Sequence, residues 1–160
     1  MQRKQYYIAY GSNLNTRQMA FRCPEAEMVG TGVLNGYELQ FRGRTNSAYA
    51  TVKEQENGKV PVLLWKLSAS DEARLDQYEG YPFQYGKRTA SVEIEGEVYQ
   101  AMLYEMQPGF KQNLPSAEYY RTILEGYENL HLPVSVLHGA IRASITAVRE
   151  ENLQEPELKL

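Results

Sequence analysis

The segment from residue 28 to residue 67 constrains the fold most, because it contains four β-rich runs and no helical periodicity between them. The runs are Met28–Leu34, Tyr37–Arg42, Ala48–Lys53 and Val60–Leu67. Asn35-Gly36 lies between the first two runs, and this dipeptide is typical of two-residue hairpin turns. A second pair, Asn57-Gly58, lies in the polar stretch before the last run, where it predicts another turn. Successive strands of this kind favour an antiparallel sheet, with Trp65 in its core.

Further strand and helix patterns follow without the regular alternation of a parallel sheet. The strand patterns are Gln5–Tyr10, Lys87–Ile94 and Val98–Tyr104, the last two joined at Glu95-Gly96-Glu97. The helical patterns are Thr16–Arg22, Ser68–Tyr78, Ala117–Gly126 and a stretch that opens at Pro133. About seven strands and three or four helices in this order predict an α+β fold with a mostly antiparallel, curled sheet.

Size and charge limit the class of protein further. The 160 residues suit one domain, expected over residues 1–149, with a polar C-terminal tail at 150–160. A net charge of -3 gives no reason to expect nucleic acid or an anionic membrane as a partner. The apolar run Tyr6–Tyr10 is too short for a signal peptide, and no stretch approaches the ~20 apolar residues of a membrane span. The single cysteine, Cys23, fits a reducing compartment, so we expect a cytoplasmic protein.

The stretch Tyr10–Leu14 joins the first strand to the first helix and is a candidate binding loop. Gly11 allows a sharp turn there. Asn15 is a good helix N-cap, and Gln18 three residues later completes a capping-box pattern. Backbone N–H groups at the start of a helix favour an anion, so this loop predicts a carboxylate or phosphate cradle. The alternative is an ordinary turn from a strand to a helix.

Glu79 is the candidate carboxylate, because it follows the helical pattern Ser68–Tyr78 and precedes Gly80, a typical helix terminator. Its aromatic neighbours in the sequence are Tyr78, Tyr81, Phe83 and Tyr85. Desolvation by these rings and the negative end of the helix dipole both raise a carboxylate pKa, which suits a general acid or base. The alternative is a solvated surface carboxylate.

Other common catalytic groups lack the necessary patterns. His131 and His138 lie seven residues apart and, with one cysteine elsewhere, form no zinc motif. Cys23 has no partner motif for a nucleophile, and Ser12 is not in a G-x-S-x-G elbow. No Gly-rich phosphate-binding motif is present. We therefore expect no metal and no cofactor.

Three segments together resemble the γ-glutamylcyclotransferase (AIG2-like) family, in the family's order and over residues from about 6 to about 140. They are Ile8–Leu14, then Leu75–Gly80 followed by Tyr85, then Pro115–Tyr119 followed by Gly126-Tyr127 and Leu132-Pro133. The first segment resembles the family's signature loop. The resemblance implies a small β-barrel flanked by helices.

The resemblance also implies a reaction and a set of site residues. In such enzymes the α-amine of a γ-glutamyl compound attacks its own γ-carbonyl, which gives 5-oxoproline and a free amino acid in a lactam-forming acyl transfer (a lyase-type reaction). Because the nucleophile belongs to the substrate, neither a metal nor a cofactor is needed. Glu79 takes the role of the catalytic acid and base. The implied substrate-binding residues are Tyr10, Gly11, Ser12, Asn13, Leu14, Tyr85 and Tyr119, with Tyr85 one residue away from the family's spacing.

Several alternatives stay open from the sequence alone. The Ser-Asn-Leu of the loop favours γ-glutamyl amino acids over γ-glutamyl amines or glutathione, and a related specialised metabolite is a further candidate. A non-catalytic binder of an acidic metabolite, or a protein-interaction domain with a tyrosine-rich surface, is the alternative class. For each tyrosine the alternative is a hydrogen-bonded core residue. The leaving group would pass the segments Gly43–Ser47 or Gln107–Pro115, whose sequences indicate no preference. Oligomeric state, and whether the loop amides bind the oxyanion or the α-carboxylate, are likewise left open.

Overall fold

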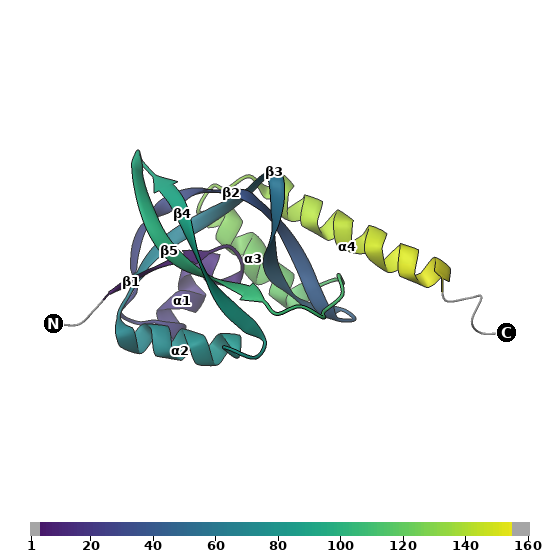
Figure 1. The fold of residues 1–160 in the computed structure, drawn as a ribbon, viewed down its shortest axis with the longest axis horizontal. Coiled ribbons are helices and arrows are strands. Elements are labelled where there is room, and N and C mark those ends of the chain that lie inside the picture. The colour runs from purple at the N-terminus through teal and green to yellow at the C-terminus, as the bar shows by residue number, and fades with distance from the viewer. Residues whose placement is uncertain (1–3, 155–160) are drawn as a thin grey trace.

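A closed five-stranded barrel forms the centre of the computed structural model, which describes residues 4–154 (Figure 1). The strands are β1 (Gln5–Ala9), β2 (Glu27–Arg44), β3 (Ser47–Leu67), β4 (Tyr85–Ile94) and β5 (Glu97–Met106). Their order around the barrel is β1-β3-β2-β4-β5. Neighbouring strands are antiparallel except β1 and β5, which close the barrel as a parallel pair at Tyr7 and Met102. The predicted α+β class with a curled, mostly antiparallel sheet is confirmed.

The four strands predicted between residues 28 and 67 are two long strands, β2 and β3, so the prediction of about seven strands was wrong. The chain reverses not at Asn35-Gly36 but at Thr45-Asn46, between the paired residues Arg44 and Ser47. Gly36 lies instead at an irregularity in the pairing, with a φ of +83°. Asn57, also at positive φ, lies in the opposite strand within residues 55–58, which are left outside the regular pairing. Both Asn-Gly pairs therefore serve a bulge, which bends the hairpin so that it can close the barrel.

The second predicted hairpin is confirmed as β4 and β5. Ile94 pairs with Glu97, so the turn contains only Glu95 and Gly96, and both have positive φ. These angles match the type I′ turns that suit the twist of antiparallel strands.

Four α-helices and one short 3₁₀ turn complete the described part of the chain. They are η1 (Ser12–Leu14), α1 (Thr16–Arg22), α2 (Ala69–Glu79), α3 (Ala117–Asn129) and α4 (Val134–Gln154). The caps predicted for α2 are confirmed, because the Ser68 side chain accepts the Asp71 N–H and Gly80 ends the helix with a φ of +65°. In Figure 1, α4 begins beside the barrel and leads away from it. No helix in the described part of the chain is both long and apolar enough to cross a membrane.

The end of α4 differs from the predicted polar tail. Residues 150–154 are helical, whereas residues 155–160 lie outside the described part of the chain. The sequence around Arg149 to Glu151 lacks apolar residues but consists of good helix formers. Glu151 also forms an ion pair with Lys111 at 2.7 Å, which ties this end of the helix to the loop after β5.

Candidate active site

The turn η1, which follows β1, is fixed by a network around Asn13. The Asn13 side chain donates to the Tyr7 hydroxyl at 2.9 Å and accepts from the Arg22 guanidinium. Its main-chain carbonyl accepts the indole N–H of Trp65 at 3.1 Å. Trp65 is buried in the core, as predicted, and also supports this turn.

Two glycines allow η1 to lie close to its neighbours. A Cβ atom on Gly11 would lie 3.1 Å from the Cβ of Ala50 and 3.6 Å from the Tyr119 hydroxyl. A Cβ atom on Gly126 would lie only 2.8 Å from the main-chain carbon of Leu14. Gly126, predicted to end a helix, lies inside α3 instead. A glycine suits this position because η1 packs directly against it. Leu14 is fully buried in this contact, and its side chain lines no part of the pocket described below.

The side chains around the start of α1 pair with one another. Asn15 caps the helix by accepting the Gln18 N–H at 3.1 Å, as predicted. The Glu125 carboxylate from α3 accepts from the Asn15 side chain at 2.7 Å and from Arg17. These hydrogen bonds lower the pKa of Glu125.

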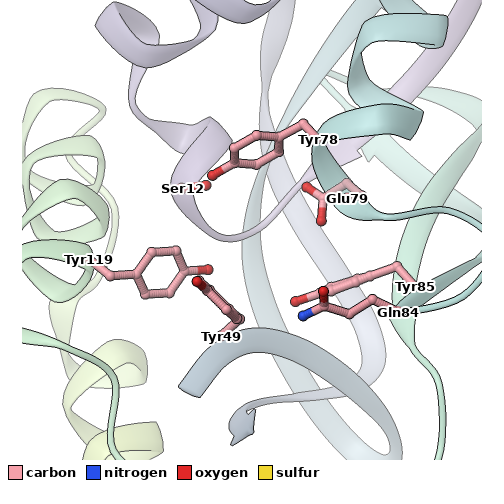
Figure 2. A pocket seen from close by; sticks show the side chains of 7 residues that line it. All are labelled: Ser12, Tyr49, Tyr78, Glu79, Gln84, Tyr85 and Tyr119. Carbon is pink, nitrogen blue, oxygen red and sulfur yellow. The ribbon is translucent and has the colours of Figure 1, made fainter. Parts of the chain in front are cut away.

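A cavity of about 150 Å³ opens between η1, the C-terminal end of α2 and the start of α3 (Figure 2). Seven residues line it: Ser12, Tyr49, Tyr78, Glu79, Gln84, Tyr85 and Tyr119. A smaller cavity of about 20 Å³ adjoins it, and its lining includes Tyr7, Tyr10, Gly11, Asn13, Ala50 and Tyr104. We call the two cavities together the inner pocket. Of the site residues predicted from the sequence, all except Leu14 line it.

Glu79 is the last residue of α2, and its carboxylate points into the inner pocket in Figure 2. Burial raises the pKa of this carboxyl group to about 7, and the nearby positive charge of Arg22 opposes the shift. Within residues 4–154, no donor forms a hydrogen bond to the Glu79 carboxylate. Near neutral pH the group can therefore both accept and release a proton.

Tyr85 and Tyr119 both hydrogen-bond the backbone of Ala50, but in opposite senses. The Tyr85 hydroxyl donates to the Ala50 carbonyl at 2.7 Å, whereas the Tyr119 hydroxyl accepts the Ala50 N–H at 3.1 Å. Burial raises the pKa of both phenols, and the charge of Glu79 adds to this. Both are therefore neutral at physiological pH. Tyr119 keeps its proton for a ligand, while Tyr85 offers only a lone pair.

Tyr10 forms part of the back wall. Its hydroxyl donates to the main-chain carbonyl of Tyr104 on β5, and burial raises its pKa well above the usual value. The Tyr104 hydroxyl donates in turn to Asp76 of α2. Asp76 also forms an ion pair with Lys87 at 2.9 Å. This chain of contacts fixes α2, and with it Glu79, against the barrel.

The η1 turn supplies two backbone donors to the inner pocket. In a 3₁₀ turn the first N–H groups have no partner within the turn. Leu14 donates to the Gly11 carbonyl and closes the turn, so the N–H groups of Ser12 and Asn13 precede the first internal hydrogen bond. Both residues line the inner pocket.

Three residues that line the larger of the two cavities were missed by the sequence reasoning. Tyr78 was noted only as a neighbour of Glu79, yet it lines the pocket and its ring packs under the Arg22 guanidinium at 3.8 Å. Tyr49 packs edge-on against Tyr119, with ring centroids 5.1 Å apart. Tyr49 lies between buried Ala48 and Ala50 on β3. Because side chains alternate along a strand, the sequence could have predicted that Tyr49 lies on the opposite face of the strand from these two alanines. Gln84 has no comparable sequence signal.

Within residues 4–154, no group of histidine, cysteine and acidic side chains is arranged to hold a metal ion.

Comparisons with known proteins identify relatives of this chain in sequence and in fold. The family model described as "Gamma-glutamyl cyclotransferase, AIG2-like" matches residues 7–127. The chain is 30% identical over 142 residues to the gamma-glutamylcyclotransferase of Bos taurus, with 80% of this chain and 72% of the relative covered. It is 29% identical over 147 residues to the Homo sapiens protein of the same name, with the same coverage. A solved structure of a gamma-glutamyl cyclotransferase superposes with a TM-score of 0.77 at 25% identity, covering 86% of each chain.

Proposed function

The chain belongs to the gamma-glutamyl cyclotransferase, AIG2-like family, and we propose that it converts a γ-glutamyl amino acid to 5-oxoproline and a free amino acid, with Glu79 as the catalytic acid and base. The observation that supports this most is the position of Glu79, which lies across the inner pocket from the Ser12 turn. A lone acid opposite a set of neutral donors suits a reaction in which the substrate supplies its own nucleophile.

The proposed reaction begins with one proton transfer. The substrate α-ammonium lies beside Glu79, and the carboxylate takes one proton from it. The freed amine attacks the γ-carbonyl carbon, which forms the C–N bond of the five-membered ring. The original γ-amide C–N bond then breaks as Glu79 returns the proton to the leaving nitrogen. The ring nitrogen still holds one proton more than a lactam, and it releases this proton through Glu79 to the departing amine, which leaves as an ammonium. Substrate and products contain the same atoms, so no water is consumed.

The raised pKa of Glu79 makes the first step easier. Moving a proton from an α-amine with a pKa near 8 to an ordinary glutamate with a pKa near 4.3 is uphill by about 5 kcal/mol. With the pKa of Glu79 at about 7, the same transfer is uphill by only ~1.4 kcal/mol. Holding the glutamyl chain folded then supplies proximity, which amounts to several kcal/mol.

The remaining polar groups stabilise negative oxygens of the substrate. The Tyr119 hydroxyl retains its proton because it accepts from Ala50, and the Ser12 and Asn13 amides are the nearby backbone donors. One donor aimed at the developing oxyanion is typically worth ~3–4 kcal/mol. We assign the Tyr119 hydroxyl to the oxyanion, and the η1 amides to the α-carboxylate of the glutamyl group.

The test is to incubate the protein with γ-glutamyl-alanine and measure 5-oxoproline. Glu79→Gln should lower kcat by about 10²–10⁴-fold, because the amide cannot exchange a proton. Glu128→Gln is the matched control, because Glu128 is exposed on α3 and lies outside the inner pocket. Full activity of Glu79→Gln would contradict the assigned role. Tight calorimetric binding of several γ-glutamyl amino acids without 5-oxoproline would favour a non-catalytic binder instead.

A further inference from the structure

A larger cavity of about 580 Å³ adjoins the inner pocket, and we call it the outer pocket. It shares Tyr49 and Gln84 with the inner pocket, so these two residues mark the boundary between them. Its other walls include Arg42 and Arg44 at the end of β2, Phe83 before β4 and Phe110 after β5. A group bonded to a substrate in the inner pocket can therefore extend directly into this space.

The side of the outer pocket formed by the loop after β5 is held in place by backbone hydrogen bonds. The Gly43 N–H donates to the Lys111 carbonyl at 2.9 Å, and the Arg42 guanidinium donates to the Phe110 carbonyl at 2.7 Å. These contacts fix the loop after β5 against the end of β2. The outer pocket is therefore bounded here by fixed backbone.

The opposite side is tied to the same loop through Gln107. Its N–H donates to the Gln84 carbonyl at 2.9 Å, and its side chain donates to the Pro82 carbonyl at 2.8 Å. Phe83 lies between these two contacts, so its backbone is held although its side chain is 87% exposed. An exposed phenyl ring on a fixed backbone offers apolar surface that a ligand can cover.

The charges of the two pockets are opposite. The inner pocket contains the carboxylate of Glu79, whereas the lining of the outer pocket contains two arginines and no acidic residue. Arg42 is already engaged by Gln40 and by the Phe110 carbonyl. Arg44 is exposed and forms no ion pair within the described residues. Arg44 is therefore the guanidinium available to an anionic group of a ligand.

We propose that the outer pocket is the leaving-group subsite, and that it selects γ-glutamyl amino acids whose leaving residue has a free carboxylate and a large apolar side chain. Arg44 pairs with the carboxylate, and Phe83 packs against the side chain. This inference rests on the proposed function. The volume supports it, because about 580 Å³ is in the ~300–1,000 Å³ range of pockets that enclose drug-sized ligands, far more than a leaving alanine needs.

The test compares three substrates by their kcat/KM for formation of 5-oxoproline. γ-Glutamyl-phenylalanine should exceed γ-glutamyl-alanine by about tenfold, since even one added methylene in an apolar pocket is worth ~10-fold or more. γ-Glutamyl-phenethylamine has the same ring without the carboxylate. It should be about fivefold poorer than γ-glutamyl-phenylalanine, the size expected for a partly exposed ion pair.

Two variants assign these effects to residues. Arg44→Gln should lower kcat/KM about fivefold for γ-glutamyl-phenylalanine and leave γ-glutamyl-phenethylamine unchanged. Phe83→Ala should lower kcat/KM about fivefold for γ-glutamyl-phenylalanine and leave γ-glutamyl-alanine unchanged. The matched controls are Arg149→Gln on α4 and Phe21→Ala on α1. Both residues are exposed and lie outside both pockets, so neither should change any of the three values.

The outcomes separate this inference from the proposed function. Turnover of γ-glutamyl-alanine equal to that of γ-glutamyl-phenylalanine would overturn the subsite and leave the activity standing. An equal loss for all three substrates in Arg44→Gln would also overturn it, because the effect would then not depend on the carboxylate. Absence of 5-oxoproline from all three substrates would overturn the proposed function, and the subsite with it.

Discussion

The inner and outer pockets meet at Tyr49 and Gln84 but are built from opposite kinds of side chain. In the inner pocket, hydroxyl groups such as those of Tyr85 and Tyr119 also form hydrogen bonds that hold the barrel together. In the outer pocket, Arg44 and Phe83 are exposed, and the fold there is held by backbone contacts instead. The difference teaches that chemistry and stability are coupled in the inner pocket, whereas specificity in the outer pocket can change without affecting either.

Tyr119→Phe should lower activity and stability together, because it removes a proposed donor and a structural acceptor. We expect kcat/KM for γ-glutamyl-alanine to fall about 10²–10³-fold, the usual cost of one oxyanion donor. The buried Ala50 N–H also loses its acceptor, which should lower the free energy of unfolding by about 1–3 kcal/mol. Steady-state kinetics and urea unfolding measure the two effects.

Tyr120→Phe is the control for this change, because Tyr120 is the next residue on α3 and lines neither pocket. It should leave both quantities nearly unchanged. A Tyr119→Phe protein that loses stability but keeps full activity would break the coupling and leave Tyr119 a purely structural residue.

The pH dependence should sharpen the contrast through Glu79. The proposed base must be ionised, and its pKa of about 7 means that only about one molecule in a hundred is ionised at pH 5. We therefore expect kcat/KM to fall about hundredfold between pH 8 and pH 5, with the midpoint near 7. Both substrates depend on Glu79 in the same way, so the ratio of their kcat/KM values should stay constant over this range. A ratio that changes with a midpoint near 7 would contradict this separation.

Glu79→Gln should stabilise the fold at high pH while removing activity. The pKa of Glu79 is higher in the folded protein than in the unfolded chain, so folding favours the protonated form. That contribution is fully present below about pH 4.5 and is lost as the pH rises through 7. The variant should therefore be more stable than the parent by about 1–3 kcal/mol at pH 8, and equal to it at pH 4. Urea unfolding at both pH values measures this, and a variant that is less stable at pH 8 would contradict it.

The sequence predicted the helix that carries Glu79 better than the strands around the inner pocket. Glu79 could be located because local signals, Ser68 at one end and Gly80 at the other, define the helix that carries it. The Asn-Gly pairs misled, because positive φ is needed equally in a hairpin turn and in a bulge, and only the pairing of β2 with β3 decides between them. Nor could the sequence show that Glu125, more than a hundred residues away, pairs with the Asn15 side chain at the start of α1.

The sequence analysis named two segments that the leaving group would pass, but it could not predict the shape or charge of the outer pocket, because contacts between distant segments create it. Gly43 and Lys111 are joined by one backbone hydrogen bond, as are Gln84 and Gln107. The residue types in these two pairs give no indication of which residue each one contacts. The segments Gly43–Ser47 and Gln107–Pro115 showed no preference in sequence, yet together they bring Arg44 and Phe110 to one cavity.

Ionic strength should give the smallest effect and should appear only in the outer pocket. Arg44 is exposed, so salt screens its attraction for a substrate carboxylate as the Debye length falls from about 30 Å at 0.01 M to about 3 Å at 1 M. The KM of γ-glutamyl-phenylalanine should rise about twofold to fourfold over that range, close to the whole value of an exposed pair. The KM of γ-glutamyl-phenethylamine should stay constant, because it lacks the carboxylate, and Arg44→Gln should abolish the difference between the two substrates. If salt raised the KM of both substrates equally, the screened charge would be that of the glutamyl group, which both substrates share. The charge contrast between the two pockets would then not govern binding.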